Sequence, residues 1–261
     1  MDFRVTIIIT SFNHRSYLEE AVDSVLRQSS LPFEILIADD NSTDGSQDLI
    51  RAYELRYPGL VKGVFQKTNV GIPRNRNAAL NLVRGNYVGI LDGDDLFLPE
   101  KLDLQIQALK ENPDSKAVYG NFNIVDSNRK LISAKWQGPQ PAGRIFTDVA
   151  KMKTGLLRTL IVDHTLVKEA GLLDVRLPRY DGLWLTIKLA AKCKFTYIDK
   201  TLIEKRDHTS SDSKTIAPAE HLHDLKLIYH DLESLLPGLA DATQRQQITT
   251  VWQDQFSRLE T

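Results

Sequence analysis

Short apolar runs alternate with segments of helical spacing over the first 120 residues of the chain. The apolar runs are bounded by turn signals and rich in β-branched residues, which is typical of buried strands. They lie at residues 5–9, 33–38, 61–66, 87–91 and 117–120. Between the first two runs, apolar side chains recur at helical spacing, at Leu18, Ala21, Val22, Val25 and Leu26. Further helices are predicted from Asp44 to residue 57, after Pro73, and at Pro99, expected at an early helical position.

This alternation of strands and helices with short connections predicts an α/β fold. Strands that are separated by helices pair in parallel, and the helices then cover both faces of the sheet. We therefore expect a Rossmann-like, mainly parallel central sheet flanked by helices. Ligands of such sheets bind beyond the carboxyl ends of the strands. The loops that follow the strands are thus the place to look for functional residues.

Three of these loops are polar, at residues 10–13, 39–44 and 92–95. The carboxyl ends of parallel strands lie along one rim of the sheet, so the three clusters are expected to meet there. Two of their residues also have a local explanation, because Asn13 and Asp44 stand where N-caps of the following helices are expected. Phe12 ends the first strand, where it would be either a stacking platform for a base or a core residue.

The loop after the fourth strand, Asp92-Gly93-Asp94-Asp95, holds three carboxylates in four positions. Negative charges this close repel one another unless a positive group lies between them. Mn²⁺ or Mg²⁺ would fit, because both ions prefer oxygen ligands and bridge to phosphates. Gly93 gives the turn backbone freedom and keeps Cβ bulk away. An acidic turn alone is usually a solvated loop, and the two other clusters on the same rim favour a site.

The second half of the chain is less regular. Asp181 precedes an almost wholly apolar helix, which is expected to be buried. A polar loop at residues 204–211 carries Arg206 and His208. From residue 218 onward the spacing is helical, with a break near Pro237. The remaining predictions are a hairpin at 123–135, a Pro- and Gly-rich flap at 137–143, a short helix at 167–171, and short strands at 195–198 and 202–204.

Composition restricts the partners and the location of the protein. The 261 residues are 42% hydrophobic and 26% charged, and a formal net charge of −1 gives no electrostatic case for nucleic acid as a partner. Cys193 is the single cysteine, so no internal disulfide forms. The sequence shows no apolar run of membrane-spanning length and no signal-peptide pattern. We expect a cytoplasmic protein, with peripheral attachment to the inner face of the membrane left open.

The motifs, in their order and spacing, resemble those of the family 2 glycosyltransferases of GT-A fold. The resemblance spans about residues 3–213 and rests on residues 6–13, 37–44 and 91–95, on Asn69-x-Gly71 with Arg76-Asn77, on Asp181-x-Leu183-Trp184-Leu185, and on Arg206-x-His208-x-x-Ser211. It implies an inverting enzyme with a nucleotide-sugar donor, most simply a UDP-sugar, and a Mn²⁺ or Mg²⁺ cofactor. Thymine-type and guanine donors stay open. Members of this family often assemble bacterial cell-surface polysaccharide, which implies a glycan or lipid-linked acceptor.

The same resemblance implies a role for each matched residue. The nucleotide would be held by Thr10, Phe12, Asn13, Asp40, Arg76, Asp92 and Gly93. The donor sugar would lie near Asp95, the diphosphate near Arg206 and His208, and the metal between Asp94 and His208, while Asp181 would be the catalytic base. The domains implied are a glycosyltransferase domain at 1–217, with a nucleotide-binding half at 1–120 and an acceptor half at 121–217, and a helical C-terminal extension at 218–261.

The chemistry of these residue types agrees with sugar transfer. A nucleoside diphosphate gains negative charge as its bond to the sugar breaks, and a divalent cation together with Arg206 would stabilise that charge. The acceptor hydroxyl must lose a proton while it attacks from the opposite face, and Asp181 can take that proton. We also expect the helix N-terminus at Asp181 to favour the ionised carboxylate.

Three other functions fit the sequence less well than sugar transfer does. A non-catalytic nucleotide-sugar-binding scaffold of the same fold is disfavoured by the presence of both Asp94 and Asp181. A nucleotidyltransferase should carry a Gly-rich loop after the first strand, and residues 11–16 contain no glycine. A Rossmann oxidoreductase is excluded, because no GxGxxG motif follows a strand. One departure is Tyr180, at a position where many relatives carry a second acidic residue.

The helices after residue 218 lie outside the resemblance and are expected to be accessory. A homodimer through these helices, docking on a membrane surface, or packing on the main domain would each explain their apolar spacing. Membrane docking ranks last, because this segment has little excess positive charge.

Overall fold

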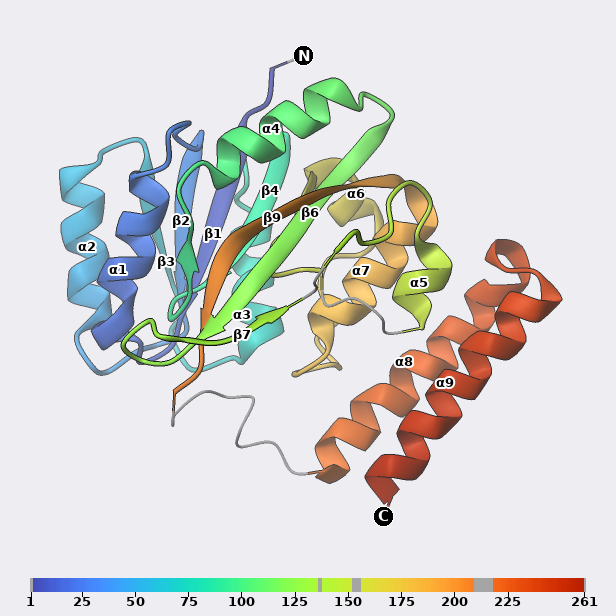
Figure 1. The fold of residues 1–261 in the computed structure, drawn as a ribbon. Helices are drawn as coiled ribbons and strands as arrows, with labels where there is room; N and C mark the ends of the chain where they lie inside the picture. The colour runs from blue at the N-terminus through green and yellow to red at the C-terminus, as the bar shows by residue number, and fades with distance from the viewer. Residues whose placement is uncertain (1, 136–137, 152–155, 209–217, 261) are drawn as a thin grey trace.

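The computed structural model describes residues 2–135, 138–151, 156–208 and 218–260. A nine-stranded sheet runs through this part of the chain in the order β3-β2-β1-β4-β8-β6-β9-β5, and β7 pairs with β6 (Figure 1). The strands are β1 Val5–Ser11, β2 Glu34–Asp39, β3 Val61–Phe65, β4 Tyr87–Asp92, β5 Leu96–Phe97, β6 Ser115–Val125, β7 Leu131–Lys135, β8 Ile161–Asp163 and β9 Lys194–Arg206.

Most of these strands point the same way. β1 pairs in parallel with β2 and β4, β2 pairs in parallel with β3, and β6 pairs in parallel with β9. The short strand β8 is antiparallel to both β4 and β6, so β4 and β6 share one direction. Only β5, β7 and β8 run the opposite way among the described strands. The predicted α/β fold with a mainly parallel sheet is confirmed.

Helices cover both faces of the sheet (Figure 1). Successive side chains of a strand point to opposite faces, so the apolar strands of this sheet need cover on both. Ile7 and Ile9 of β1 belong to one buried cluster and Ile8 belongs to the other. The first cluster is closed by α1 Arg15–Leu26, α2 Ser46–Arg56 and α4 Lys101–Glu111. The second is closed by α3 Ile72–Leu80, α5 Phe146–Ala150, α6 His164–Glu169 and α7 Asp181–Lys192. The helix predicted after Asp181 is therefore present and buried.

Several elements differ from the predictions. β9 is one strand where two short strands were predicted, because its pairing with β6 continues through register shifts near Gly120 and Asn121. Arg206 therefore ends a strand instead of lying in a loop. Pro99 precedes α4, whose N-cap is Glu100. The predicted hairpin is confirmed as β6 and β7, whereas β5, β8 and α5 are short elements that no local pattern indicated.

The two predicted caps have different outcomes. Asn13 does not cap α1, because the N-cap is His14 and the side-chain oxygen of Asn13 accepts a hydrogen bond from Thr43 N at 2.9 Å. Asn13 instead joins the loops after β1 and β2. Asp44 precedes the N-cap of α2 and still accepts a hydrogen bond from Ser46 N, at 3.0 Å, so it satisfies a donor of the helix start from just outside the helix.

The C-terminal chain forms two helices, α8 Pro218–Leu239 and α9 Ala242–Glu260, which pack against each other (Figure 1). α8 continues through Pro237, because a proline in the last turn removes a single backbone hydrogen bond, and the break falls after Leu239. Leu225, Ile228 and Leu232 are buried in the same cluster as the apolar face of α7. Of the three explanations for these helices, packing on the main domain is the one that the structure supports.

Two further features of the described chain concern its helices and its cysteine. Among its helices, none combines the length and the apolar character that crossing a membrane requires. Cys193, the C-cap of α7, is buried, and burial raises the pKa of its thiol to about 12.

Candidate functional site

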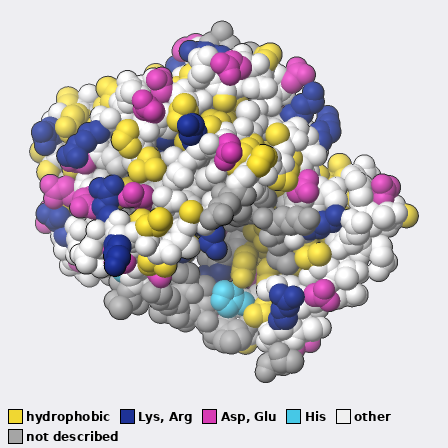
Figure 2. All heavy atoms as spheres, in the orientation of Figure 1, with side chains coloured by type: hydrophobic (Ala, Val, Ile, Leu, Met, Phe, Trp, Pro, Cys, Tyr) yellow, Lys and Arg dark blue, Asp and Glu magenta, His cyan; other side chains and the backbone are white. Residues whose placement is uncertain are grey.

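The register of the sheet brings the polar clusters together at one rim. Thr10 lies beside Asp92 in the β1–β4 pair, and Ser11 lies beside Asp39 in the β1–β2 pair. The Thr10 hydroxyl also donates a hydrogen bond to Asp92 Oδ1 at 3.2 Å. These strands end toward the lower side of the molecule as drawn in Figure 1. Figure 2 shows that the molecule is hollowed on this side, with Lys or Arg and His side chains in and beside the hollow.

Gly93 allows the acidic turn to lie directly against the end of β1. Its backbone N–H donates a hydrogen bond to the carbonyl oxygen of Thr10 at 2.8 Å. A Cβ at position 93 would lie only 2.6 Å from that same backbone oxygen, a distance at which one of them must move. The close approach, more than an unusual backbone angle, is therefore what requires glycine here.

Two guanidinium groups balance the carboxylates of this turn. Arg76 Nη2 donates to Asp92 Oδ1 at 2.6 Å, and Arg158 Nη1 donates to Asp92 Oδ2 at 2.9 Å and also contacts Asp95. Burial by itself raises the pKa of Asp92, but the two arginines outweigh it and hold that pKa well below its usual range. Burial, together with the nearby carboxylates, raises the pKa of Asp95 against the opposing effect of Arg158.

Arg158 is a residue of this site that the sequence did not reveal. It lies in an irregular stretch before β8, where no motif or spacing distinguishes it from a surface arginine. The three carboxylates of the acidic turn require a positive charge among them, and from the sequence we expected a metal ion to supply it. In the structure, side chains of the protein supply much of it, while Asp94 points elsewhere.

Asp94 lies beside His208, with Asp94 Oδ2 and His208 Nε2 3.0 Å apart. The His208 and Tyr17 rings pack at a tilt with centroids 4.7 Å apart, and the guanidinium of Arg206 lies 4.6 Å from the centroid of the Tyr17 ring. Arg206 also pairs with Glu20 of α1 at 2.5 Å, a contact absent from the sequence argument, and its backbone N–H donates to Asp95 at 2.9 Å. The predicted diphosphate residues and the acidic turn thus form one connected network.

The side chains of Asp94 and His208 fit a metal ion whose remaining ligands would come from a bound diphosphate and from water. Mg²⁺ and Mn²⁺ are often held by one or two side chains, with phosphate oxygens and waters completing the shell. Among the described residues, no group of three or more His, Cys, Asp and Glu side chains could hold a metal. Asp94 and His208 would therefore hold the ion only in the presence of the nucleotide diphosphate, because these two side chains do not form a complete coordination shell.

Asp181 opens α7 at the same rim and is joined to Asp92 through a single side chain. Arg76 Nη1 donates to Asp181 Oδ2 at 3.0 Å, while the other nitrogen of that guanidinium bonds Asp92. Gly182 N donates to Asp181 Oδ1 at 2.7 Å, and the Asp181 side chain is only 4% exposed. Burial raises the pKa of Asp181 despite these donors. The backbone N–H of Gly182 at the helix start favours the ionised carboxylate, as expected, but burial outweighs it.

The nucleotide candidates Phe12 and Asp40 lie on the loops after β1 and β2. Phe12 is 44% exposed, so the alternative that it is a core residue is excluded. Asp40 is buried, and its two carboxylate oxygens accept hydrogen bonds from Val70 N at 2.7 Å and Gly71 N at 2.9 Å. Asp40 thus ties the loop after β3 to the rim, and its contact with a base stays a prediction.

Comparison with known proteins establishes the family. Residues 6–164 match the sequence model of the family described as glycosyl transferase family 2. The chain belongs to this family. The glycosyltransferase is 39% identical over 186 residues to the putative teichuronic acid biosynthesis glycosyltransferase TuaG of Bacillus subtilis, covering 70% of this chain and 71% of TuaG.

Two further curated relatives of this glycosyltransferase show how coverage varies. It is 29% identical over 187 residues to WfgD of Escherichia coli, named as a UDP-Glc:alpha-D-GlcNAc-diphosphoundecaprenol beta-1,3-glucosyltransferase, covering 71% of this chain and 70% of WfgD. It is 36% identical over 138 residues to the uncharacterized glycosyltransferase alr2836 of Nostoc, covering 52% of this chain and 42% of that protein. The chain thus spans less than half the length of some relatives that it matches.

Solved structures share the fold of this glycosyltransferase. Staphylococcus aureus TarS, crystallised with UDP-GlcNAc, superimposes with a TM-score of 0.75 at 21% identity, over 97% of this chain and 73% of that one. The mannosyltransferase PcManGT of Pyrobaculum calidifontis, solved with GDP-Man and Mn²⁺, gives a TM-score of 0.67 at 18% identity, over 98% of this chain and 70% of that one. The expected GT-A fold is confirmed.

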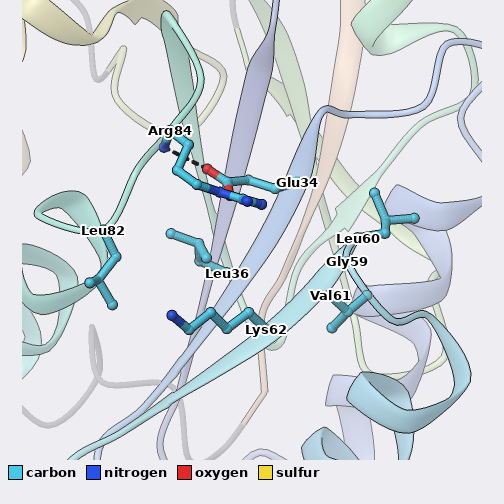
Figure 3. A pocket seen from close by; sticks show the side chains of 8 residues that line it. All are labelled: Glu34, Leu36, Gly59, Leu60, Val61, Lys62, Leu82 and Arg84. Carbon is cyan, nitrogen blue, oxygen red and sulfur yellow. Dashed lines mark hydrogen bonds and ion pairs between the residues drawn. The ribbon is translucent and has the colours of Figure 1, made fainter.

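The glycosyltransferase has a second hollow, with a volume of about 310 Å³ (Figure 3). Its walls include Leu36, Leu82 and Lys62, and Glu34 is fixed beside it by Arg84 Nε at 2.6 Å. Glu34 and Lys62 stand at the amino ends of β2 and β3. The hollow is therefore at the opposite end of the strands from the acidic turn, and the candidate site is not there.

Proposed function

We propose that this family 2 glycosyltransferase is an inverting enzyme that moves a sugar from a nucleoside-diphosphate sugar to an acceptor hydroxyl. The donor proposed is a UDP-sugar, since TarS was solved with UDP-GlcNAc and WfgD is named for UDP-Glc. The GDP-Man in PcManGT keeps a guanine nucleotide as the alternative. The names of TuaG and WfgD support a role in cell-surface polysaccharide synthesis, with a glycan or lipid-linked acceptor.

The observation that carries the proposal is the link from Asp181 through Arg76 to Asp92. One guanidinium bonds both carboxylates, at 3.0 and 2.6 Å, so the candidate base stands directly beside the acidic turn. A transferase needs this arrangement, because the donor lies over the turn while the acceptor hydroxyl must reach the sugar from the other side. A binding scaffold would have no need for a buried carboxylate at that position.

Asp181 would act as the general base in this reaction. Its Oδ2 atom accepts one hydrogen bond in the structure, from Arg76, and a carboxylate oxygen has room for a second donor. The acceptor hydroxyl would donate to this oxygen and pass its proton as the new bond to the sugar forms. Burial makes Asp181 a stronger base and Arg76 moderates that effect, which suits proton transfer near neutral pH.

The residues near Arg206 would meet the leaving group. Arg206 and His208 lie together beside Tyr17, and Arg206 is held by Glu20, so a diphosphate would find an aligned cation there. A bound Mn²⁺ or Mg²⁺, held by Asp94 and His208, would neutralise negative charge that develops on the diphosphate. Thr10, Phe12, Asn13 and Asp40 would contact the nucleotide, Gly93 would allow its close approach, and Asp95 would face the donor sugar.

The test needs no knowledge of the acceptor, because water can replace it. UDP release is measured from a panel of UDP-sugars with Mn²⁺, and the anomeric form of the freed sugar is read at early times by nuclear magnetic resonance. We expect inversion of configuration. Asp181→Asn should lower kcat by about 10²-fold or more while the dissociation constant for UDP stays near the parental value. Parental turnover in Asp181→Asn, or a retained configuration, would sink the proposal.

A further inference from the structure

The N-cap residue of α7 does not cap the helix with its own side chain. Tyr180 is the N-cap and makes no side-chain capping hydrogen bond. The first turn of a helix leaves backbone N–H groups without partners inside the helix, and the residues just before it share this need. Because Asp181 is the first residue of α7, any group that holds residues 179 and 180 also fixes where the Asp181 carboxylate points.

The group that holds these residues comes from the C-terminal extension. Asp224 of α8 accepts a hydrogen bond from Arg179 N at 3.2 Å. Asp224 is only 2% exposed, so it is a buried carboxylate that faces backbone donors. Burial raises the pKa of Asp224, and the backbone N–H groups before α7 oppose that rise. The reaction itself gives this carboxylate no role.

A second contact joins the same two segments. The phenol oxygen of Tyr180 lies 2.9 Å from His221 Nδ1, and the two rings meet edge to face with centroids 5.7 Å apart. Tyr180 stands where many relatives carry an acidic residue, and in this chain it reaches toward α8. The two residues directly before the candidate base are thus both bonded to α8, Arg179 through its backbone and Tyr180 through its side chain.

α8 is itself held independently of these contacts. Its residues Ile228 and Leu232 are fully buried in the core that α7 shares. Its partner α9 is anchored by Trp252, whose indole N–H donates to the carbonyl oxygen of Ala150 at 2.7 Å. The position of Asp224 is therefore set by a packed hairpin, and a rigid hairpin can impose its geometry on the loop before α7.

We propose that the C-terminal hairpin positions the catalytic base, with Asp224 as the positioning residue and the Tyr180–His221 pair in support. This rests on the proposed function, in which Asp181 takes the proton of the acceptor. The hairpin is then a working part of the catalytic domain. It contacts no reacting atom and acts by fixing the backbone that carries Asp181. A displacement of about 1 Å at a catalytic group can lower a rate by 10²-fold.

The test compares full-length variants in the UDP-release assay. Asp224→Ala removes the acceptor and should lower kcat by about 10-fold or more, with the donor KM little changed. Asp224→Asn keeps an acceptor oxygen and should recover most of that loss. Glu233→Ala is the matched control, because Glu233 is an exposed carboxylate on the same helix. It should leave kcat unchanged.

A double variant separates positioning from stability and from the proposed function. If Asp224 acts through the base, Asp224→Ala should lower kcat no further once Asp181→Asn is present. An equal loss in both backgrounds, or parental kcat in a folded Asp224→Ala, would overturn the positioning role and leave the base assignment intact. Parental kcat in Asp181→Asn alone would instead overturn the function. Should Asp224→Ala fail to fold, Tyr180→Phe replaces it, with a smaller loss of kcat expected and parental kcat as the contrary result.

Discussion

Replacing Arg158 by methionine would remove a positive charge from between Asp92 and Asp95 while keeping an unbranched, flexible side chain in its place. The Asp95 side chain is 1% exposed and would lose its one ion-pair partner in the described chain. Removing one partner of a buried pair costs about 3–5 kcal/mol, because the remaining charge is left uncompensated. Arg158 is 26% exposed, and Arg76 still balances Asp92, so we expect the lower end, about 3 kcal/mol.

The measurement is urea unfolding of Arg158→Met and the parent at pH 5 and pH 8. A loss of this size should also lower Tm by about 6–12 °C for a chain of this length. A carboxyl whose pKa is raised on folding binds more protons when folded, so stability falls as pH rises through that range. The pKa of Asp95 is raised to about 7 in the parent and should rise further without Arg158. The loss should therefore be larger at pH 8 than at pH 5.

Two companion variants make the result decisive. Arg74→Met replaces an exposed arginine of the same type and should unfold like the parent. Asp95→Asn combined with Arg158→Met should recover most of the lost stability, because no buried charge then lacks a partner. A loss below about 1 kcal/mol at pH 8, or no recovery in the double variant, would refute the view that Arg158 neutralises a buried carboxylate.

Three further predictions address the ligand side of the rim and its backbone. Asp94→Asn should bring UDP affinity with Mn²⁺ down to the level seen with EDTA by calorimetry, and equal affinities of the parent in both conditions would contradict a metal at Asp94. Asp40→Ala should weaken UDP binding by roughly 1.5–3 kcal/mol, as expected for a lost charged acceptor, whereas unchanged affinity would place the base elsewhere. Gly93→Ala should lower the free energy of unfolding by about 1–3 kcal/mol, because its Cβ would press on the Thr10 carbonyl oxygen, and a parental urea midpoint would count against this contact.

The sequence could predict those features that depend on short segments. β1 and β4 are apolar runs, and the residues that follow them had to meet at one rim once both strands were parallel. The position of Asp181 at the start of a buried helix likewise followed from the apolar residues after it. Such inferences need only the spacing of residues within about one element, which is why they agree with the structure.

The rest depends on contacts between distant parts of the chain. Arg158 reaches Asp92 across 66 positions, and Arg206 reaches Glu20 across 186 positions, and neither partner has a local signature. The size of the burial effect on the pKa of Asp181 could not be predicted for the same reason, because burial is set by the packing of the whole domain. The role of α8 was also hidden, since apolar spacing shows that a helix packs without showing on what.

The single buried thiol at the end of α7 allows local unfolding of this part of the protein to be measured by chemical labelling. While the chain is folded, the raised pKa of Cys193 and its burial keep the reactive thiolate scarce at neutral pH. Alkylation must therefore wait for a fluctuation that exposes this end of the helix. Each chain can take up one label on sulfur, which intact-mass measurement counts directly. The ratio of labelling rates in the unfolded and folded chains then gives the free energy of that local opening, with no residue introduced for the purpose.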